Sequence, residues 1–235
     1  NYKITVRNEG GLPVQGVCIV IYEDENRETI VFTGVTDAEG VLGFTKEASE
    51  NYVAVLRDLP NGFKAEEIYK ELSENYEIRL KNVFSEDVDL GSVSYGVGSV
   101  MHDFEITSVD GSVYKLSEIL KTKKAVVLNF WFLQCGPCRS EFPFMQQAYA
   151  DFKDDIEVIA VNPTGDSQKD IIAYANEAGL TFPMADGNPQ WESAFGINAY
   201  PTTVVIDRFG TVCFMHRGAI TDKETFDKLF SYFTS

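Results

Sequence analysis

Six short runs rich in apolar residues, several of them with polar residues in alternation, recur through the first eighty positions of the chain. They are separated by segments rich in glycine, proline, asparagine and aspartate, and they cover residues 2–7, 17–22, 30–36, 41–45, 52–57 and 76–80. Alternation with a period of two is typical of strands with one buried face, and the intervening residues are typical of tight turns. The pattern predicts a small antiparallel β-sandwich over residues 1–82, without a catalytic constellation.

The pattern changes after residue 100, where longer apolar runs alternate with helical periodicity. The apolar run 125–131 predicts a buried strand. Phe142, Met145, Tyr149 and Phe152 then fall on one face of a helix at spacings of three and four. Further strands, helices and a hairpin are predicted at residues 156–162, 167–178, 191–195, 203–215 and 221–233. This order predicts an α/β domain over residues 100–235, with a mixed central sheet covered by helices on both faces.

Residues 83–99 differ from both flanking regions. They are rich in serine, glycine and acidic residues, which is the composition of a connector between domains. Val93, Tyr95 and Val97 alternate with polar positions, so part of this segment is expected to lie along a domain surface in extended form. The sequence therefore predicts two domains joined by a linker.

The balance of charge limits the partners that the protein can have. The chain carries 36 acidic residues against 20 lysines and arginines, a formal net charge of −16, and its basic residues form no extended cluster. This argues against binding to nucleic acid or to anionic membrane surfaces, and it favours protein partners that are neutral or basic. Because the chain has no run of about twenty apolar residues, the sequence predicts no transmembrane segment.

Cys135 and Cys138 lie at the junction between the predicted strand 125–131 and the helix that follows. Two thiols three positions apart can close a disulfide and reopen to a dithiol, so they can exchange two electrons with other thiols. The free N–H groups and the dipole at a helix N-terminus stabilise a thiolate and lower its pKa. We therefore expect Cys135, the outer cysteine, to attack a partner disulfide, and Cys138 to resolve the mixed disulfide.

The same two cysteines are also compatible with a structural disulfide, with half of a zinc site, or with a chance spacing. A bridge that closes so short a loop constrains the unfolded chain little, so it stabilises poorly. Cys213 and His216 could complete a zinc site, but they lie three apart on a predicted strand and point to opposite faces. Cys18 and Cys213 are expected to be buried free thiols. No metal and no cofactor other than the redox-active disulfide is predicted.

Several segments of the second domain carry motifs of a known family. They are residues 102–107, 110–119, the run LNFW at 128–131, the run CGPC at 135–138, 139–143, 159–162 and the run YPTTVVID at 200–207. Through them the chain from about residue 98 onward resembles the thioredoxin fold, and specifically the extracytoplasmic TlpA/ResA group of thiol-disulfide oxidoreductases. Through residues 11–17, 36–44 and 52–55, the first domain resembles prealbumin-like or carboxypeptidase-regulatory-like modules.

The resemblance implies roles for individual residues. The peptide bond before Pro201 is expected to be cis and to lie beside the disulfide, with Tyr200 facing the partner. Glu141 is expected to manage the proton of the inner thiol; the alternative is a glutamate that only complements the helix dipole. The remaining residues expected to line the partner-binding surface are Trp131, Gln134, Gly136 and Pro137.

Three features of the motif bear on the direction and detail of the chemistry. Asn129 stands where thioredoxin has an aspartate, as in much of the TlpA/ResA group, so the thioredoxin proton path is absent. Gln134 replaces the tryptophan that usually precedes the first cysteine. Gly136 and Pro137 between the cysteines resemble thioredoxin and favour a reducing role.

The resemblance implies an extracytoplasmic thiol-disulfide oxidoreductase, secreted or anchored to the membrane, for instance as a lipoprotein. It is expected to reduce exported partner proteins, apocytochromes among them, and to be re-reduced by a membrane thiol-transfer protein. Since the chain begins with Asn1 rather than Met, a signal segment is expected upstream. The alternatives are oxidation of partner thiols, a non-catalytic module that binds peptide beside Pro201, and a thiol peroxidase, whose lone-cysteine pattern is not found.

Overall fold

The structure is a computed structural model that describes residues 1–234 except 48, 50, 61–62 and 83–88. The chain divides into two compact units, Asn1–Val83 and Phe84–Ser235, each of which is described by itself. Within the described ranges, no helix combines the length and the apolar character needed to cross a bilayer.

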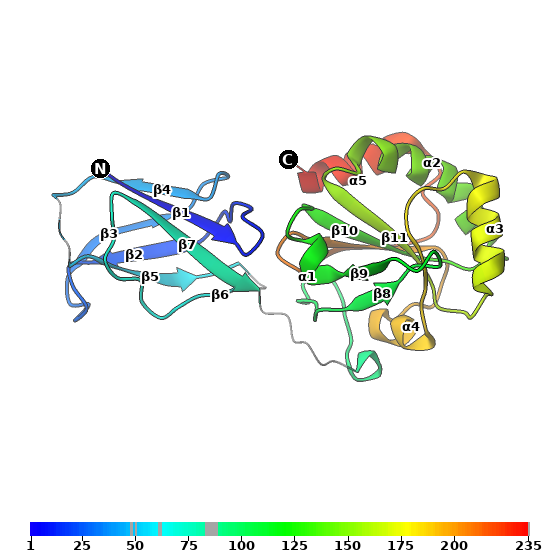
Figure 1. The fold of residues 1–235 in the computed structure, drawn as a ribbon, viewed down its shortest axis with the longest axis horizontal. Helices are drawn as coiled ribbons and strands as arrows, with labels where there is room; N and C mark the ends of the chain where they lie inside the picture. The colour runs from blue at the N-terminus through cyan, green and yellow to red at the C-terminus, as the bar shows by residue number, and fades with distance from the viewer. Residues whose placement is uncertain (48, 50, 61–62, 83–88, 235) are drawn as a thin grey trace. The chain divides into compact units, whose positions relative to one another are not determined.

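The first unit consists mostly of β-strands (Figure 1). They are β1 Tyr2–Asn8, β2 Cys18–Tyr22, β3 Ile30–Val35, β4 Val41–Phe44, β5 Val53–Asp58, β6 Phe63–Lys64 and β7 Asn75–Asn82. One sheet has the order β4-β1-β7-β6 and the other the order β3-β2-β5. The prediction that all pairs are antiparallel is wrong for β1 and β7, which are parallel. Alternation along a strand shows which of its faces is buried. It does not show whether a neighbouring strand that is distant in sequence runs parallel or antiparallel to it.

Side chains connect the two sheets of this unit. Phe32 of β3 stacks on Phe44 of β4, with ring centroids 5.2 Å apart, and Phe44 stacks in turn on Tyr2 of β1 at 4.9 Å. Gly34 leaves room for Leu42, because a Cβ atom at residue 34 would lie 2.5 Å from the Leu42 side chain. These contacts join the sheets, while their closure into a sandwich stays a prediction.

The predicted linker 83–99 begins outside the described residues, at 83–88. Its remainder packs on the second unit through the short 3-10 helix η1, Leu90–Ser92, and the extended residues after it. The Tyr95 ring is buried against Phe195, and its backbone N–H donates to the carbonyl of Ala194. Residues 89–99 are therefore bound to the second unit over most of their length.

The second unit is built around a five-stranded mixed sheet with the order β12-β11-β10-β13-β14. Its central strand β10 runs parallel to β11 and antiparallel to β13. The strands of the unit are β8 Glu105–Thr107, β9 Val113–Lys115, β10 Ala125–Phe130, β11 Ile156–Asn162, β12 Met184–Asp186, β13 Thr202–Asp207 and β14 Val212–Arg217. The helices are α1 Leu116–Ile119, α2 Gly136–Phe152, α3 Gln168–Ala178, α4 Pro189–Phe195 and α5 Lys223–Thr234. The predicted α/β domain with a mixed central sheet is confirmed, and its architecture is the thioredoxin fold.

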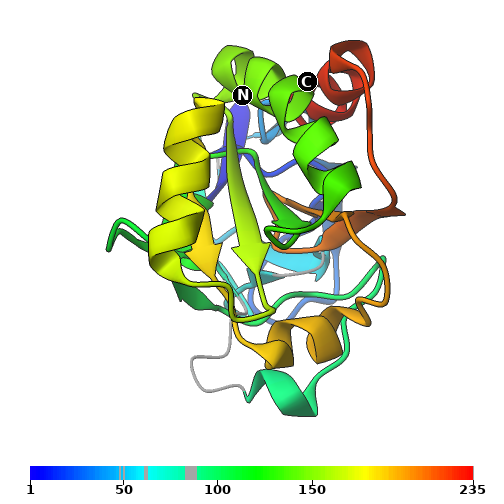
Figure 2. The same ribbon diagram turned by 90° about the vertical axis from the view of Figure 1, so that its right-hand side faces the viewer.

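Helices cover both faces of this sheet, and β10 contributes side chains to both cores. Val126, Leu128 and Phe130 pack in a cluster with residues of α1 and α4. Ala125 and Val127 pack in a second cluster with residues of α2, α3 and α5. Figure 2 shows α2 and α5 together at the top and α4 at the bottom of the view. The period of two along β10 thus decides which of its side chains can reach α2.

Candidate active site

The two cysteines of the motif lie at the junction between β10 and α2, as the sequence predicts, and they are joined as a disulfide. Cys135 is the N-cap of α2, and its Sγ accepts a hydrogen bond from the Cys138 backbone N–H at 3.2 Å. Cys135 is 4% exposed and Cys138 is not exposed at all. Of the two cysteines, only Cys135 keeps any exposed surface, and it lies at the end of the helix where the free N–H groups favour negative charge.

The first turn of α2 carries features that suit this position. Pro137 stands at the start of the helix, where its missing N–H costs no hydrogen bond. The Arg139 guanidinium lies 4.7 Å from the ring centroid of Tyr174 on α3. This contact holds one positive charge at the N-terminus of α2, where it adds to the field of the helix.

Glu141 is fully buried, one turn after Cys138 on the same face of α2. Its Oε1 accepts a hydrogen bond from Asn129 Nδ2 at 2.7 Å, and its Oε2 accepts one from the Ile220 backbone N–H at 2.6 Å. Burial raises the pKa of Glu141 to about 7, and the two hydrogen bonds oppose that rise. A glutamate that only complemented the helix dipole would lie at the surface, so the dipole alone does not account for this side chain.

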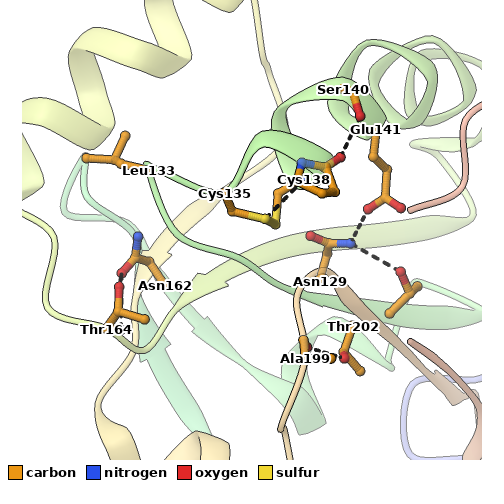
Figure 3. The surroundings of a disulfide bond; sticks show 12 residues. Asn129, Leu133, Cys135, Cys138, Ser140, Glu141, Asn162, Thr164, Ala199 and Thr202 are labelled. Atoms are coloured by element: carbon orange, nitrogen blue, oxygen red, sulfur yellow. Dashed lines mark hydrogen bonds between the residues drawn. A yellow bond between two sulfur atoms is a disulfide. The ribbon is translucent and has the colours of Figure 1, made fainter. Parts of the chain in front are cut away.

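Asn129 connects the central strand to this carboxylate (Figure 3). It is fully buried and, by the alternation along β10, points to the α2 face. Its Nδ2 donates to Glu141 and also to Thr203 Oγ1 of β13, at 3.1 Å. Among the described residues its Oδ1 is buried without a hydrogen-bond partner. The asparagine thus replaces the proton-accepting aspartate of thioredoxin by a group that donates to Glu141.

The loop before β13 forms the other side of the site. The Tyr200–Pro201 peptide bond is cis, which confirms the expectation from the resemblance. The half-buried Tyr200 ring lies edge-on to Phe132, with centroids 5.2 Å apart, and its hydroxyl donates to the Glu192 carboxylate of α4. Burial and the neighbouring Glu192 raise the pKa of the Tyr200 hydroxyl, so it remains a proton donor. Tyr200 also packs on the core cluster that contains both cysteines.

The structure separates the remaining predicted partner-binding residues into two groups. Gln134, Gly136 and Pro137 are exposed beside the disulfide, where a partner can contact them. Trp131 is fully buried and packs on Phe142, with ring centroids 5.1 Å apart. The prediction that Trp131 lines the partner surface is therefore corrected, because the alternation that places Asn129 against α2 also turns Trp131 into that core.

Two contacts at the site were not foreseen from the sequence. The Ile220 N–H reaches Glu141 from the segment ahead of α5, a residue separation of 79 that leaves no local signal. Asp166 accepts a hydrogen bond from the Leu133 backbone N–H at 2.7 Å and so holds the turn before Gln134. Asp166 directly precedes Ser167, the N-cap of α3, and its contact with Leu133 spans 33 residues, so no local pattern indicates it.

The remaining cysteines are not part of the site. Cys18 and Cys213 are free and half-buried rather than fully buried. The Cys213 thiol donates to Asp207 Oδ2 at 3.1 Å, and burial, together with this carboxylate, raises the pKa of the thiol to about 12. In the described part of the chain, no three histidine, cysteine or acidic side chains form a group that could hold a metal ion.

Known proteins resemble the second unit. The model of the AhpC/TSA family matches residues 97–215. The thioredoxin-like protein YneN of Bacillus subtilis is 35% identical over 134 residues, which cover 56% of this chain and 78% of that protein. The thiol-disulfide oxidoreductase ResA of Geobacillus thermodenitrificans is 35% identical over 54% of this chain and 73% of its own length.

A solved structure agrees with these sequence matches. It comes from Chlorobium tepidum and is assigned as a thiol:disulfide interchange protein, DsbE. Its sequence is 33% identical to this chain, and the two superpose with a TM-score of 0.53 over 60% of this chain and 100% of that chain. The names of ResA and of this structure describe exchange between thiols and disulfides. This is the chemistry that the disulfide at the N-terminus of α2 can carry out. The chain belongs to the AhpC/TSA family, and it is a thioredoxin-like thiol-disulfide oxidoreductase of the ResA and DsbE kind.

Proposed function

We propose that the protein reduces disulfides of exported partner proteins outside the cytoplasm. The observation that carries this proposal is the place of the Cys135–Cys138 pair at the N-terminus of α2, where Cys135 keeps a small exposed surface and Cys138 and Glu141 are fully buried. A dithiol with one accessible and one shielded sulfur attacks with the first and resolves with the second. Exposed Gln134, Gly136 and Pro137 on one side and Tyr200 on the other supply the surface on which a partner segment would lie.

The reaction proceeds in two exchanges. The Cys135 thiolate attacks one sulfur of the partner disulfide, and the partner's second sulfur leaves as a thiolate that takes up a proton. Cys138 then attacks Cys135 Sγ, its proton passes to the Glu141 carboxylate, and the partner's remaining sulfur leaves and is protonated. Two electrons have moved from the protein dithiol to the partner. Because its pKa is about 7, Glu141 can both take and release a proton near neutral pH.

The reducing direction is supported by the Gly136–Pro137 dipeptide, which resembles that of thioredoxin. An extracytoplasmic location and exported partners are supported by the resemblance to the TlpA/ResA group. A membrane thiol-transfer protein is the proposed source of electrons, since the two-electron cycle requires a reductant. For the first unit we propose a β-sandwich of the prealbumin-like or carboxypeptidase-regulatory-like kind, supported by the contacts of Phe32, Phe44 and Leu42 between its sheets.

Two measurements test this function. Equilibration of the full chain with glutathione couples gives the potential of the Cys135–Cys138 pair. A value near the ~−270 mV of thioredoxin supports reduction, whereas one near the ~−120 mV of DsbA would reverse the direction to oxidation. Cys138→Ser should accumulate covalent complexes with partner proteins through Cys135, and mass spectrometry identifies what is trapped. Partners held equally well by a Cys135→Ser, Cys138→Ser double variant would instead indicate a module that only binds.

A further inference from the structure

The buried Oδ1 atom of Asn129 is the feature of the site that the proposed reaction does not use. Among the described residues it has no hydrogen-bond partner, although the other half of the same amide makes two hydrogen bonds. A buried carbonyl oxygen without a partner loses its hydrogen bonds to water and gains none in return, which destabilises the fold. A buried unpaired polar atom at the centre of a redox site is therefore a candidate for a functional role.

The surroundings of this oxygen change when the disulfide opens. Cys138 and Glu141 lie three positions apart on α2, so their side chains are neighbours on one face of the helix. Asn129 contacts Glu141 from β10 at 2.7 Å, which places its amide opposite that face. In Figure 3 the amide nitrogen of Asn129 is turned to Glu141 and the carbonyl oxygen to the side of the disulfide. Oxidised Cys138 has no proton to donate, whereas the reduced thiol has one.

We propose that Asn129 Oδ1 accepts a hydrogen bond from the Cys138 thiol in the reduced protein. One rigid amide would then hold the inner thiol on its carbonyl side and Glu141 on its nitrogen side. The unpaired oxygen of the oxidised state becomes paired on reduction. This inference rests on the proposed function and deepens it, because it assigns to Asn129 the control of when the resolving sulfur ionises.

The chemistry follows from which form of the thiol the amide favours. A hydrogen bond to the neutral thiol, and the partial negative charge of the accepting oxygen, both disfavour the thiolate and raise the Cys138 pKa. Cys138 then stays protonated while Cys135 attacks, and it loses its proton to Glu141 only as its sulfur bonds to Cys135. Asn129 donates to the carboxylate that receives that proton, so it positions both ends of the transfer without carrying the proton itself.

In the part of the chain that the structure describes, the polar groups around Glu141 come from four segments. They are Cys138 on α2, Asn129 on β10, Thr203 on β13 behind Asn129, and the Ile220 N–H ahead of α5. Of these only Cys138 titrates. Its ionisation and that of Glu141 are therefore coupled, and a test of the Asn129 hydrogen bond must remove the carboxylate first.

The test follows the Cβ carbon resonance of Cys138 by NMR in the reduced full chain, with Glu141→Gln as the reference background. Adding Asn129→Leu, which has a similar shape and no polar atom, should lower the Cys138 pKa enough to raise its thiolate fraction at fixed pH by roughly tenfold. Adding Thr203→Val instead removes only the hydrogen bond that the Asn129 Nδ2 group donates to Thr203. This variant should leave the pKa of Cys138 unchanged. An unchanged titration in the Asn129→Leu protein would overturn the proposal.

A second measurement needs no change at Asn129, in case leucine at this position prevents folding. The S–H stretching band of Cys138 in the reduced wild-type chain, assigned by its loss in Cys138→Ser, should lie at the lower frequency of a hydrogen-bonded thiol. A band at the frequency of a free thiol would contradict the inference. Neither measurement requires turnover, so a wrong Asn129 assignment can be told from a failure of the proposed function, which the trapping experiment and the potential report.

Discussion

Two cysteines of the second unit lie near a carboxyl group, the buried Glu141 or the half-buried Asp207, and their other surroundings differ. Cys138 lies one turn before Glu141 in α2 and is bonded to Cys135, the N-cap of the helix, which is 4% exposed. Cys213 lies on β14 and donates its proton directly to Asp207. Both carboxyl groups have pKa values raised by burial. A carboxyl group whose pKa is raised by burial therefore lies near a thiol in both places and cannot by itself mark a redox site.

The difference lies in the backbone and in access. The motif cysteines begin a helix, where free N–H groups stabilise a thiolate. Cys213 sits within β14, at the shift in register against β13, and not at the start of a helix. The carboxylate beside it keeps its proton in place. Reactivity therefore follows from the helix terminus and from a second cysteine within bonding distance.

The largest expected effect is the loss of disulfide reduction when the accessible sulfur is removed. Cys135→Ser should reduce turnover of a model disulfide such as insulin to the background rate, because Cys138, the other motif cysteine, is fully buried. The matched variant is Cys213→Ser, which should keep the wild-type rate. Turnover that survives in Cys135→Ser and falls in Cys213→Ser would reverse the comparison.

The second prediction concerns the inertness of Cys213. With its pKa raised to about 12 from 9.0 by burial and by Asp207, its thiolate fraction at pH 8 should be about a thousandfold lower than that of an ordinary thiol. Site-resolved alkylation of the reduced chain, followed by peptide mass spectrometry, should show Cys135 modified first and Cys213 far more slowly than a free cysteine. Asp207→Asn should speed Cys213 alkylation only in part, because burial, the largest cause, remains. Equal rates at Cys135 and Cys213 would contradict this difference between the two thiols.

Much of the redox centre could be predicted from the sequence because its signals are local. The apolar run before Cys135 and the helical spacing after it determine a strand-to-helix junction, and Glu141 lies a short distance along the same helix. The cis bond before Pro201 followed only from the resemblance. These features depend on neighbouring residues or on motifs shared with relatives.

The remainder depends on segments that meet only in the folded chain. The Ile220 N–H reaches Glu141 across 79 positions, and the pairing of Tyr200 with Glu192 depends on how α4 packs. The parallel pairing of β1 with β7 was missed for the same reason. Trp131 was misplaced because a residue next to a motif is not necessarily exposed; the strand alternation decided its direction.

The third prediction compares the two carboxyl groups through stability. The pKa of Glu141 is raised from 4.5 to about 7, so the folded protein binds this proton more tightly than the unfolded chain. The resulting stabilisation, on the order of 3 kcal/mol in the free energy of unfolding, is fully present below about pH 4.5. It is lost as the pH rises through about 7. Urea unfolding of oxidised Glu141→Gln across this range should lack that decline.

Asp207→Asn is the matched variant for this measurement. The pKa of Asp207 is also raised by burial, but its carboxylate accepts hydrogen bonds from Thr211, Phe209 and Cys213, which oppose the rise. Its removal should therefore flatten the pH dependence less than Glu141→Gln does. If Asp207→Asn removed the larger part of the decline, the assignment of the acid-stabilised group to Glu141 would be wrong.

The smallest expected effect concerns the binding of the partner protein. Besides a reactive thiol, the motif has a neighbouring surface at Tyr200 that is proposed to receive the partner. Tyr200→Phe keeps the ring against Phe132 but loses the hydrogen bond to Glu192. Such a bond contributes on the order of 1 kcal/mol, so KM for a partner disulfide should rise a few-fold while the pKa of Cys135 and kcat stay unchanged. Glu192→Gln retains an acceptor and should lie between Tyr200→Phe and the wild type. A fall in kcat with KM unchanged would place Tyr200 in the chemistry of the sulfur instead of the surface that receives the partner.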